Sequence, residues 1–183
     1  MRGTCFYPLV AALLLATPLT SALSATAGEE AKPCVEAAAM NNARLESLIR
    51  RIGDDVEGRP GFWQFSVANR GIIVITDETA DRMRIISGIT ETDNIEDAQL
   101  ARMMQANFDS ALDARYAVAK GVLWSAYLHP LSTLKADDFV SGLAQVVNLA
   151  ATYGSTYSSG ALTFGGGDSS ELINKLRERA NSI

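Results

Sequence analysis

The feature that most constrains this chain is a series of three short apolar segments, joined by turn residues, between residues 62 and 89. Residues 62–67 and 82–89 are rich in aromatic or β-branched side chains, and residues 72–75 are apolar on both faces, as strands often are. The connections between these segments are only a few residues long. Connections this short join antiparallel neighbours, because parallel strands need a long crossover. The sequence therefore predicts an antiparallel meander.

Segments with a helical period lie on both sides of the meander. The first, residues 35–57, is followed by Gly58 and Pro60 and places five apolar side chains on one face: Leu45, Leu48, Ile49, Ile52 and Val56. A second helix is expected after Asp93 or Asn94, with an inward stripe of Leu100, Met103, Met104, Asn107, Phe108 and Ala111. Asn107 is the polar exception in that stripe. Its side chain is expected either to end the helix or to bond to backbone where the next strand begins.

Residues 114–119 and 122–128 predict two further strands, and a helix beginning near Asp137 and Asp138 follows them. The predicted fold class is α+β, with a mainly antiparallel five-stranded sheet and the order α-β-β-β-α-β-β-α, plus a C-terminal helix. The domain is expected to cover residues 28–157. Residues 158–170 are interpreted as a flexible Gly/Ser linker, and residues 171–183 as a short amphipathic helix with the stripe Leu172, Ile173, Leu176 and Ala180.

Residues 1–27 have the pattern of a secretory signal peptide. Arg2 precedes an apolar stretch at residues 6–17, and Ala25-Thr26-Ala27 offers the small residues that a signal peptidase recognises. The stretch is shorter than the ~20 residues that a membrane-spanning helix needs. We expect cleavage near Ala27 and a periplasmic or secreted protein that does not span the membrane after processing. Cys34 would then be the remaining cysteine, either inert or bridged to another chain.

Composition excludes several classes of function. Sixteen Lys and Arg against 21 Asp and Glu give a formal charge of −5, which disfavours nucleic acid as a partner. One histidine and two cysteines cannot assemble an ordinary zinc site. The acidic runs at residues 77–81 and 91–97 lack the spacing of a calcium loop. We therefore expect no metal ligands and no cofactor.

Two groups of side chains are candidates for function. Five aromatic residues are concentrated in two predicted strands and alternate between both faces of each strand: Phe62, Trp63, Phe65, Trp124 and Tyr127. They are interpreted as core residues or, where a face is left uncovered, as a partner-binding or dimer surface. His129, with Asp113 or Asp137, is the alternative, and it would indicate a small envelope hydrolase or lyase. A secreted protease inhibitor is a third possibility.

The order of elements, Asn107 just before the fourth strand, and the stretch Trp124–Leu134 (WSAYLHPLSTL) resemble the type III secretion chaperone-like fold. Class I secretion chaperones and YbjN-like proteins share this fold. The resemblance extends over residues 35–157. It implies a homodimer that binds extended segments of partner proteins, without cofactor or catalytic residues. The chain departs from the family in its export signal and in the added tail at residues 158–183. We expect an exported, non-enzymatic protein-binding module.

Overall fold

The first helix is shorter than its apolar pattern predicts. The computed structural model describes residues 38–159 and 170–182, and α1 spans Asn42–Ile52. The Asn41 side chain caps this helix by accepting a hydrogen bond from the Arg44 N–H at 3.0 Å. Leu45, Leu48, Ile49 and Ile52 are buried, as predicted. The prediction that the helix reaches residue 57 is wrong, because Gly53 turns the backbone to an extended conformation.

The chain continues after Gly53 into an additional strand, so the sheet has six strands and not five. β1 (Asp54–Arg59) is followed by β2 (Phe62–Val67), β3 (Arg70–Asp77), β4 (Arg82–Glu91), β5 (Arg115–Ala119) and β6 (Val122–His129). The spatial order is β1-β2-β3-β4-β6-β5, and every pair is antiparallel, which confirms the predicted sheet type. The sequence pattern extends the helix too far because Val56 lies four residues after Ile52 and continues the helical stripe.

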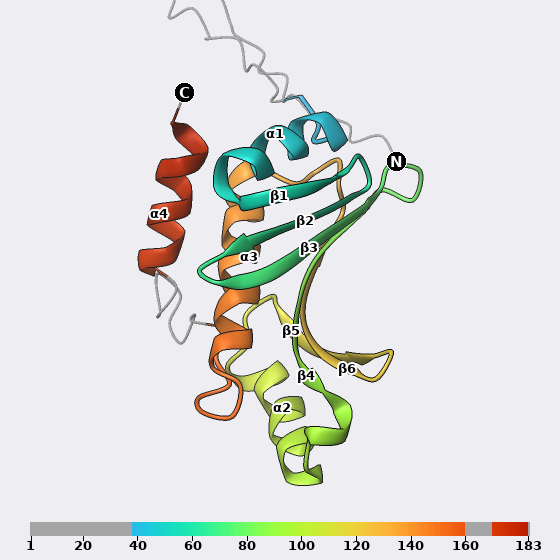
Figure 1. Cartoon of the computed structure of the whole chain (residues 1–183), viewed down its shortest axis with the longest axis vertical. Coiled ribbons are helices and arrows are strands. Elements are labelled where there is room, and N and C mark those ends of the chain that lie inside the picture. Colours follow the sequence, from blue (N-terminus) through green and yellow to red (C-terminus); the bar gives the residue numbers. More distant parts are fainter. Residues whose placement is uncertain (1–37, 160–169, 183) are drawn as a thin grey trace, which may run out of the picture. The chain divides into compact units, whose positions relative to one another are not determined.

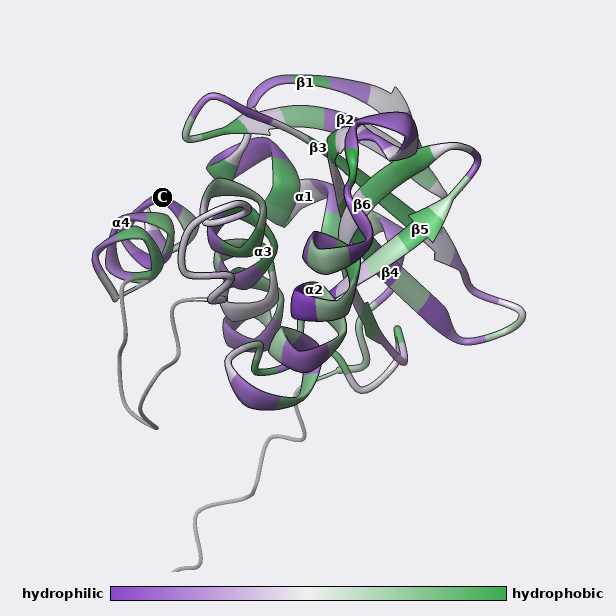
Figure 2. Cartoon of the chain, turned by 90° about the horizontal axis from the view of Figure 1, so that it is seen from below, coloured by the Kyte–Doolittle hydropathy of each residue, from purple (hydrophilic) through white to green (hydrophobic). Residues whose placement is uncertain are grey.

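The helices lie on one side of this sheet (Figures 1 and 2). A short 3-10 turn at Thr92–Asn94 leads into α2 (Asp97–Asp109), which contacts β5. α3 (Ala136–Ala151) crosses β4, β5 and β6. The face of the sheet beneath the helices supplies the core: Trp63, Phe65, Val67, Ile72, Val74, Met83, Ile85, Leu123 and Tyr127. The alternate residues of the same strands form the opposite face, which none of the described helices covers (Figure 2).

The C-terminal region is more closely attached to the domain than the sequence suggests. Ser158 and Ser159, predicted to begin a linker, are buried, and the Ser159 hydroxyl accepts a hydrogen bond from the Leu112 N–H at 2.9 Å. The remaining linker residues, 160–169, lie outside the described residues. α4 (Ser170–Asn181) packs against α1 and α3 through the predicted apolar stripe, with Leu176 only 1% exposed.

Two surface ion pairs also connect α4 to the rest of the domain. Arg177 lies 3.1 Å from Asp137 at the start of α3, and Arg179 lies 2.7 Å from Asp54 in β1. The hydrogen bond from Arg179 lowers the pKa of the Asp54 carboxyl. Within the described ranges, no helix combines the length and apolar character needed to cross a membrane.

Replacing Leu176 with alanine should lower the free energy of unfolding by ~2–5 kcal/mol, because a fully buried leucine would leave a cavity between the helices. Lys175→Ala on the exposed side of the same helix is the matched control and should change it by less than about 0.5 kcal/mol. Urea denaturation followed by circular dichroism measures both. Equal stability of the two variants would show that α4 contributes nothing to the fold.

Candidate binding surface

The structure separates the five candidate aromatic residues into two groups. Trp63, Phe65 and Tyr127 are buried beneath the helices and belong to the core. Phe62 and Trp124 lie on the uncovered face, where both line the same groove. The alternation of the two strands explains this division, since successive side chains of a strand point to opposite faces.

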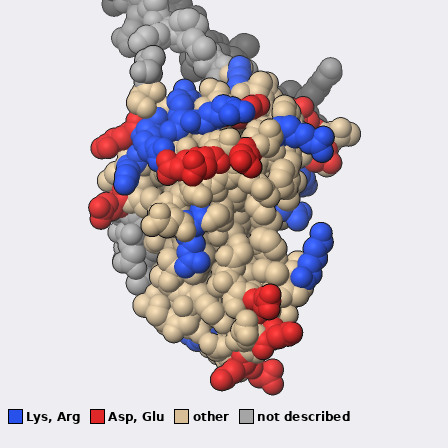
Figure 3. Space-filling model, in the orientation of Figure 1, with Lys and Arg blue, Asp and Glu red and all other residues tan. Residues whose placement is uncertain are grey.

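This groove, called the sheet groove below, has a volume of about 540 Å³ and runs across strands β2, β3, β4, β6 and β5. Its large apolar side chains are Phe62, Ile73, Ile75, Ile86, Trp124 and Leu128, and its small ones are Ala117, Ala119 and Ala126. Figure 3 shows the mainly uncharged, hollowed surface on this side of the molecule. Its volume is in the range of small-ligand and peptide pockets.

Local contacts hold the Trp124 ring in place within the sheet groove. The Trp124 indole N–H donates a hydrogen bond to the Ala119 carbonyl at 3.1 Å, across the tight turn between β5 and β6. Gly88 lies opposite Trp124 on β4, and even a methyl group there would already contact the indole ring. The ring therefore presents a fixed apolar surface to an occupant of the groove.

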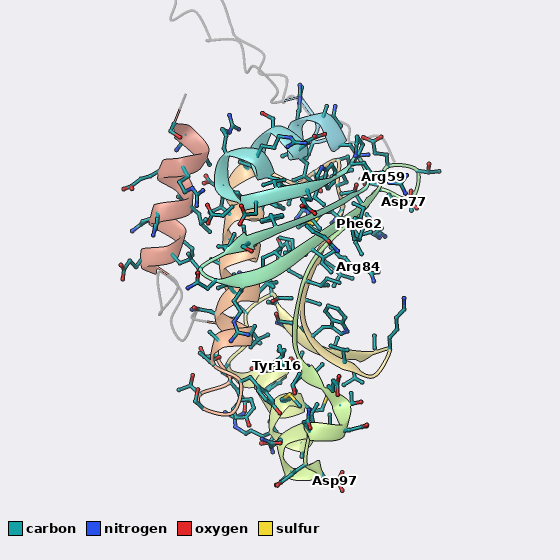
Figure 4. All side chains as sticks on the ribbon, viewed as in Figure 1. Arg59, Phe62, Asp77, Arg84, Asp97 and Tyr116 are labelled. Atoms are coloured by element: carbon teal, nitrogen blue, oxygen red, sulfur yellow. The ribbon has the colours of Figure 1, made fainter. Side chains whose placement is uncertain are left out.

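Both charged side chains that line the sheet groove are cations, Arg84 and Lys120. Arg84 on β4 lies between Ile75 on β3 and Leu128 on β6 in the register of the sheet. Phe62 on β2 lies opposite Ile75, so β3 separates it from Arg84, and Figure 4 labels both residues. Neither cation forms an ion pair with another described residue. The groove thus combines an apolar floor with positive charge that the described chain does not neutralise.

A second apolar surface lies on α2 and the adjoining strand, and consists of Leu100, Met104, Phe108 and Val118; we call it the α2 patch. The sequence pattern predicted Leu100, Met104 and Phe108 to face inward, and this is wrong, since Phe108 is 90% and Met104 61% exposed. Met103 and Ala111 are buried as predicted. α2 lies beside the edge strand β5, and only part of its apolar circumference meets the domain.

Asn107 protects the edge of β5, which confirms one of the two roles expected for it. Its side-chain oxygen accepts a hydrogen bond from the Tyr116 N–H at 2.8 Å, and its side-chain nitrogen donates to the Tyr116 carbonyl at 3.1 Å. These are the bonds that a neighbouring strand would make. Native proteins commonly block edge strands in comparable ways, because open edges invite aggregation.

The alternative site at His129 forms a polar pocket of about 460 Å³ with Asp113, Arg115, Tyr127 and Asp138. His129 Nδ1 lies 2.7 Å from the Pro130 carbonyl, and its ring stacks on Tyr127. Within the described chain, none of the carboxylates hydrogen-bonds to this imidazole. Burial, with the charges of Asp113 and Asp138, raises the pKa of Tyr127 to about 12. The phenol therefore stays protonated, and the imidazole lacks the acidic partner that general acid–base catalysis uses to orient a histidine.

Acidic side chains in the run at residues 77–81 have structural partners. The Asp81 carboxylate accepts hydrogen bonds from the Ser132 N–H at 2.7 Å and its hydroxyl at 2.9 Å, which lowers the pKa of Asp81. Glu78 accepts a hydrogen bond from the Asn42 N–H at 2.9 Å. Asp137 pairs with Arg177 of α4 and is not part of the His129 pocket. No three potential metal-ligating side chains meet within residues 38–159 and 170–182.

Comparison with known proteins finds similarity in structure but not in sequence. No protein-family model matches the chain, and no curated protein matches it. It is similar to a chain of the ExsC–ExsE complex (14% identity, TM-score 0.49), covering 61% of this chain and 92% of that one. It is also similar to a chain of the HopA1–SchA chaperone–effector complex (13%, TM-score 0.46), with coverage of 60% and 88%.

A third similar structure is that of the Yersinia pestis type III secretion chaperone SycH in complex with a stable fragment of YscM2. It has 14% identity and a TM-score of 0.49, and the match covers 61% of this chain and 98% of that one. At this identity the similarity concerns the fold alone. The TM-scores of 0.46 to 0.49 mark a partial similarity of fold, which does not place the chain in a family.

Proposed function

We propose that this protein is an exported, non-enzymatic module that binds a segment of a partner protein in the sheet groove. The observation that carries the proposal is the distribution of exposed apolar side chains. The described residues include eight large apolar side chains that are exposed to solvent. Three of them, Phe62, Ile75 and Leu128, line the groove, and four more form the α2 patch. Clustered apolar surface of this kind marks interaction sites, whereas single exposed apolar residues need no explanation.

Burial of these side chains supplies the driving force for capture. Removing one large apolar side chain from water is favourable by roughly 1.5–3 kcal/mol. Leu128 is 60% exposed in the free protein. Covering this one side chain would therefore contribute a large part of that free energy to binding. Trp124, already held in position, would be ordered at little further entropic cost.

The α2 patch is proposed to join two copies of the chain. A convex helical stripe is suited to a twofold contact, in which the same surface of both subunits is buried. Leu100, Met104 and Phe108 recur every four residues and therefore lie along one line of the helix. Pairing this line with its copy would cover the most exposed apolar side chain of the described residues, Phe108.

Replacing Met104 with lysine should shift the protein toward the monomer, because a charge would lie in the middle of the α2 patch. The matched control is Gln105→Lys, which adds the same charge at the neighbouring exposed position of α2. Sedimentation at micromolar concentration measures the mass of both variants. A monomeric unmodified protein, or a dimeric Met104→Lys variant, would contradict this contact.

Export is proposed from residues 1–27, whose pattern is that of a signal peptide. The partner would then be a protein of the periplasm or of the exterior. N-terminal sequencing of the protein recovered from the envelope should find Gly28 at its start, and an intact Met1 would contradict export by this route.

Trp124→Ala should weaken capture of a partner segment by ~2 kcal/mol, about thirtyfold, since aromatic anchors dominate binding surfaces. His129→Ala is the informative comparison, because it removes the imidazole on which an enzyme would depend and should leave capture intact. Affinities of both variants for segments selected from a displayed peptide library would be measured, with folding checked by circular dichroism. Loss of capture in His129→Ala with normal capture in Trp124→Ala would instead favour the hydrolase or lyase alternative.

A further inference from the structure

The floor of the sheet groove offers side chains but no free backbone. β2, β3, β4 and β6 each pair with a strand on both sides, so their N–H and C=O groups are used within the sheet. β5 is the one edge strand at the groove, and Asn107 already bonds both outer groups of Tyr116. A bound segment therefore meets paired backbone across the floor of the groove, and at the edge strand it meets Asn107, which blocks strand addition at Tyr116.

A segment bound to such a surface must form the hydrogen bonds of its own backbone N–H and C=O groups internally. An α-helix does so internally, and a helix packed on the face of a sheet is one of the standard layer arrangements of protein domains. The opposite face of this same sheet already uses that arrangement, with α3 across β4, β5 and β6. The geometry therefore favours a helix over an extended segment in the groove.

The charged residues that line the groove indicate which side chains should lie beside the apolar stripe of the bound helix. Arg84 and Lys120 line the groove without an ionic partner among the described residues, and no carboxylate lines it. Three acids on the same face of the sheet, Glu57, Asp77 and Glu91, lie outside the lining. Acidic side chains beside an apolar stripe would meet these cations at the edge of the groove, where charge pairs add specificity.

A second copy of the chain also offers such a helix, since Asp97 and Asp109 lie at the two ends of α2. However, Val118 of the α2 patch alternates along β5 with Ala117 and Ala119 of the groove, so the two sets of side chains project from opposite faces of this strand. Contacts between two different surfaces run head to tail and extend into open chains unless the rotation closes. A separate partner protein avoids this outcome.

We propose that the sheet groove accepts an amphipathic helix of a partner protein, apolar on one face and flanked by aspartate or glutamate. The inference rests on the proposed function and specifies the chemistry of the segment that the groove captures. The segment need not be helical before binding, because the groove itself would stabilise the helix.

Three synthetic peptides of about 15 residues, long enough to form a helix, test this inference on the full chain. The parent peptide carries leucine at positions i, i+3, i+4 and i+7, with glutamate beside the stripe and alanine elsewhere. The second peptide replaces one central alanine with proline, and the third replaces every glutamate with lysine. Fluorescence anisotropy of the labelled peptides gives their affinities.

The parent should bind, and the proline and lysine peptides should each bind about tenfold more weakly or worse. Arg84→Glu should reverse the preference between the glutamate and lysine peptides, while Arg102→Glu on α2 should leave it unchanged. Leu128→Ser should weaken binding of the parent, whereas Leu172→Ser on α4 should not. Circular dichroism should show that the parent peptide gains helix when it binds.

Each contrary result has a distinct meaning. Equal affinity for the parent and proline peptides would overturn the helix and leave the proposed function standing. Equal affinity for the glutamate and lysine peptides would overturn the acidic flanks. Failure of all three peptides, together with failure of the displayed library, would refute the proposed function as well. If Leu128→Ser converts a dimer into a monomer, the occupant is a second copy, and the inference of a separate partner is wrong.

Discussion

The fold depends on the close approach of α3 to the middle of the sheet. Tyr127 on β6 lies against Gly142, where a side-chain carbon would come within 2.6 Å of the tyrosine ring. Hydrogen bonds from the Ser125 hydroxyl to the Val146 carbonyl and from the Tyr116 hydroxyl to the Leu149 carbonyl hold the helix in the same position. Because α3 lies so close to β5 and β6, it covers one face of these strands. The opposite face is free to carry a different set of side chains.

That opposite face explains why the protein is interpreted as a binding module. An antiparallel sheet with one solvated face normally alternates apolar and polar residues. Here the uncovered face is apolar across four strands, at Phe62, Ile75, Ile86 and Leu128. The nearby edge at Tyr116 is closed by Asn107, so strand addition there is blocked. The chain thus directs association to a groove on the face of the sheet and to a helix beside it.

Much of this fold could be predicted from the sequence, because five strands and the apolar stripes of α1 and α4 follow ordinary periodicities. The sequence does not reveal β1, because Val56 continues the apolar stripe of α1. The change from helical to extended backbone at Gly53 has no periodic signal. The strand pattern showed that Phe62 opposes Trp63, but not which side the helices would cover. The α2 patch was assigned to the core because a stripe looks the same whether its own chain or another covers it. The burial of Leu176 likewise depends on contacts between distant segments.

The central claim is that the uncovered face of the sheet is the face that binds. Isoleucine methyl NMR tests it directly, since neighbouring isoleucines report on opposite faces: Ile73, Ile75 and Ile86 line the groove, while Ile72 and Ile85 lie in the core. A segment selected by the protein from a displayed library would be titrated into it. The account predicts that the methyl signals of Ile73, Ile75 and Ile86 shift strongly and those of Ile72 and Ile85 little. Shifts confined to Ile49 and Ile52 of α1, or to Ile173 of α4, would place binding on the helical side and contradict it.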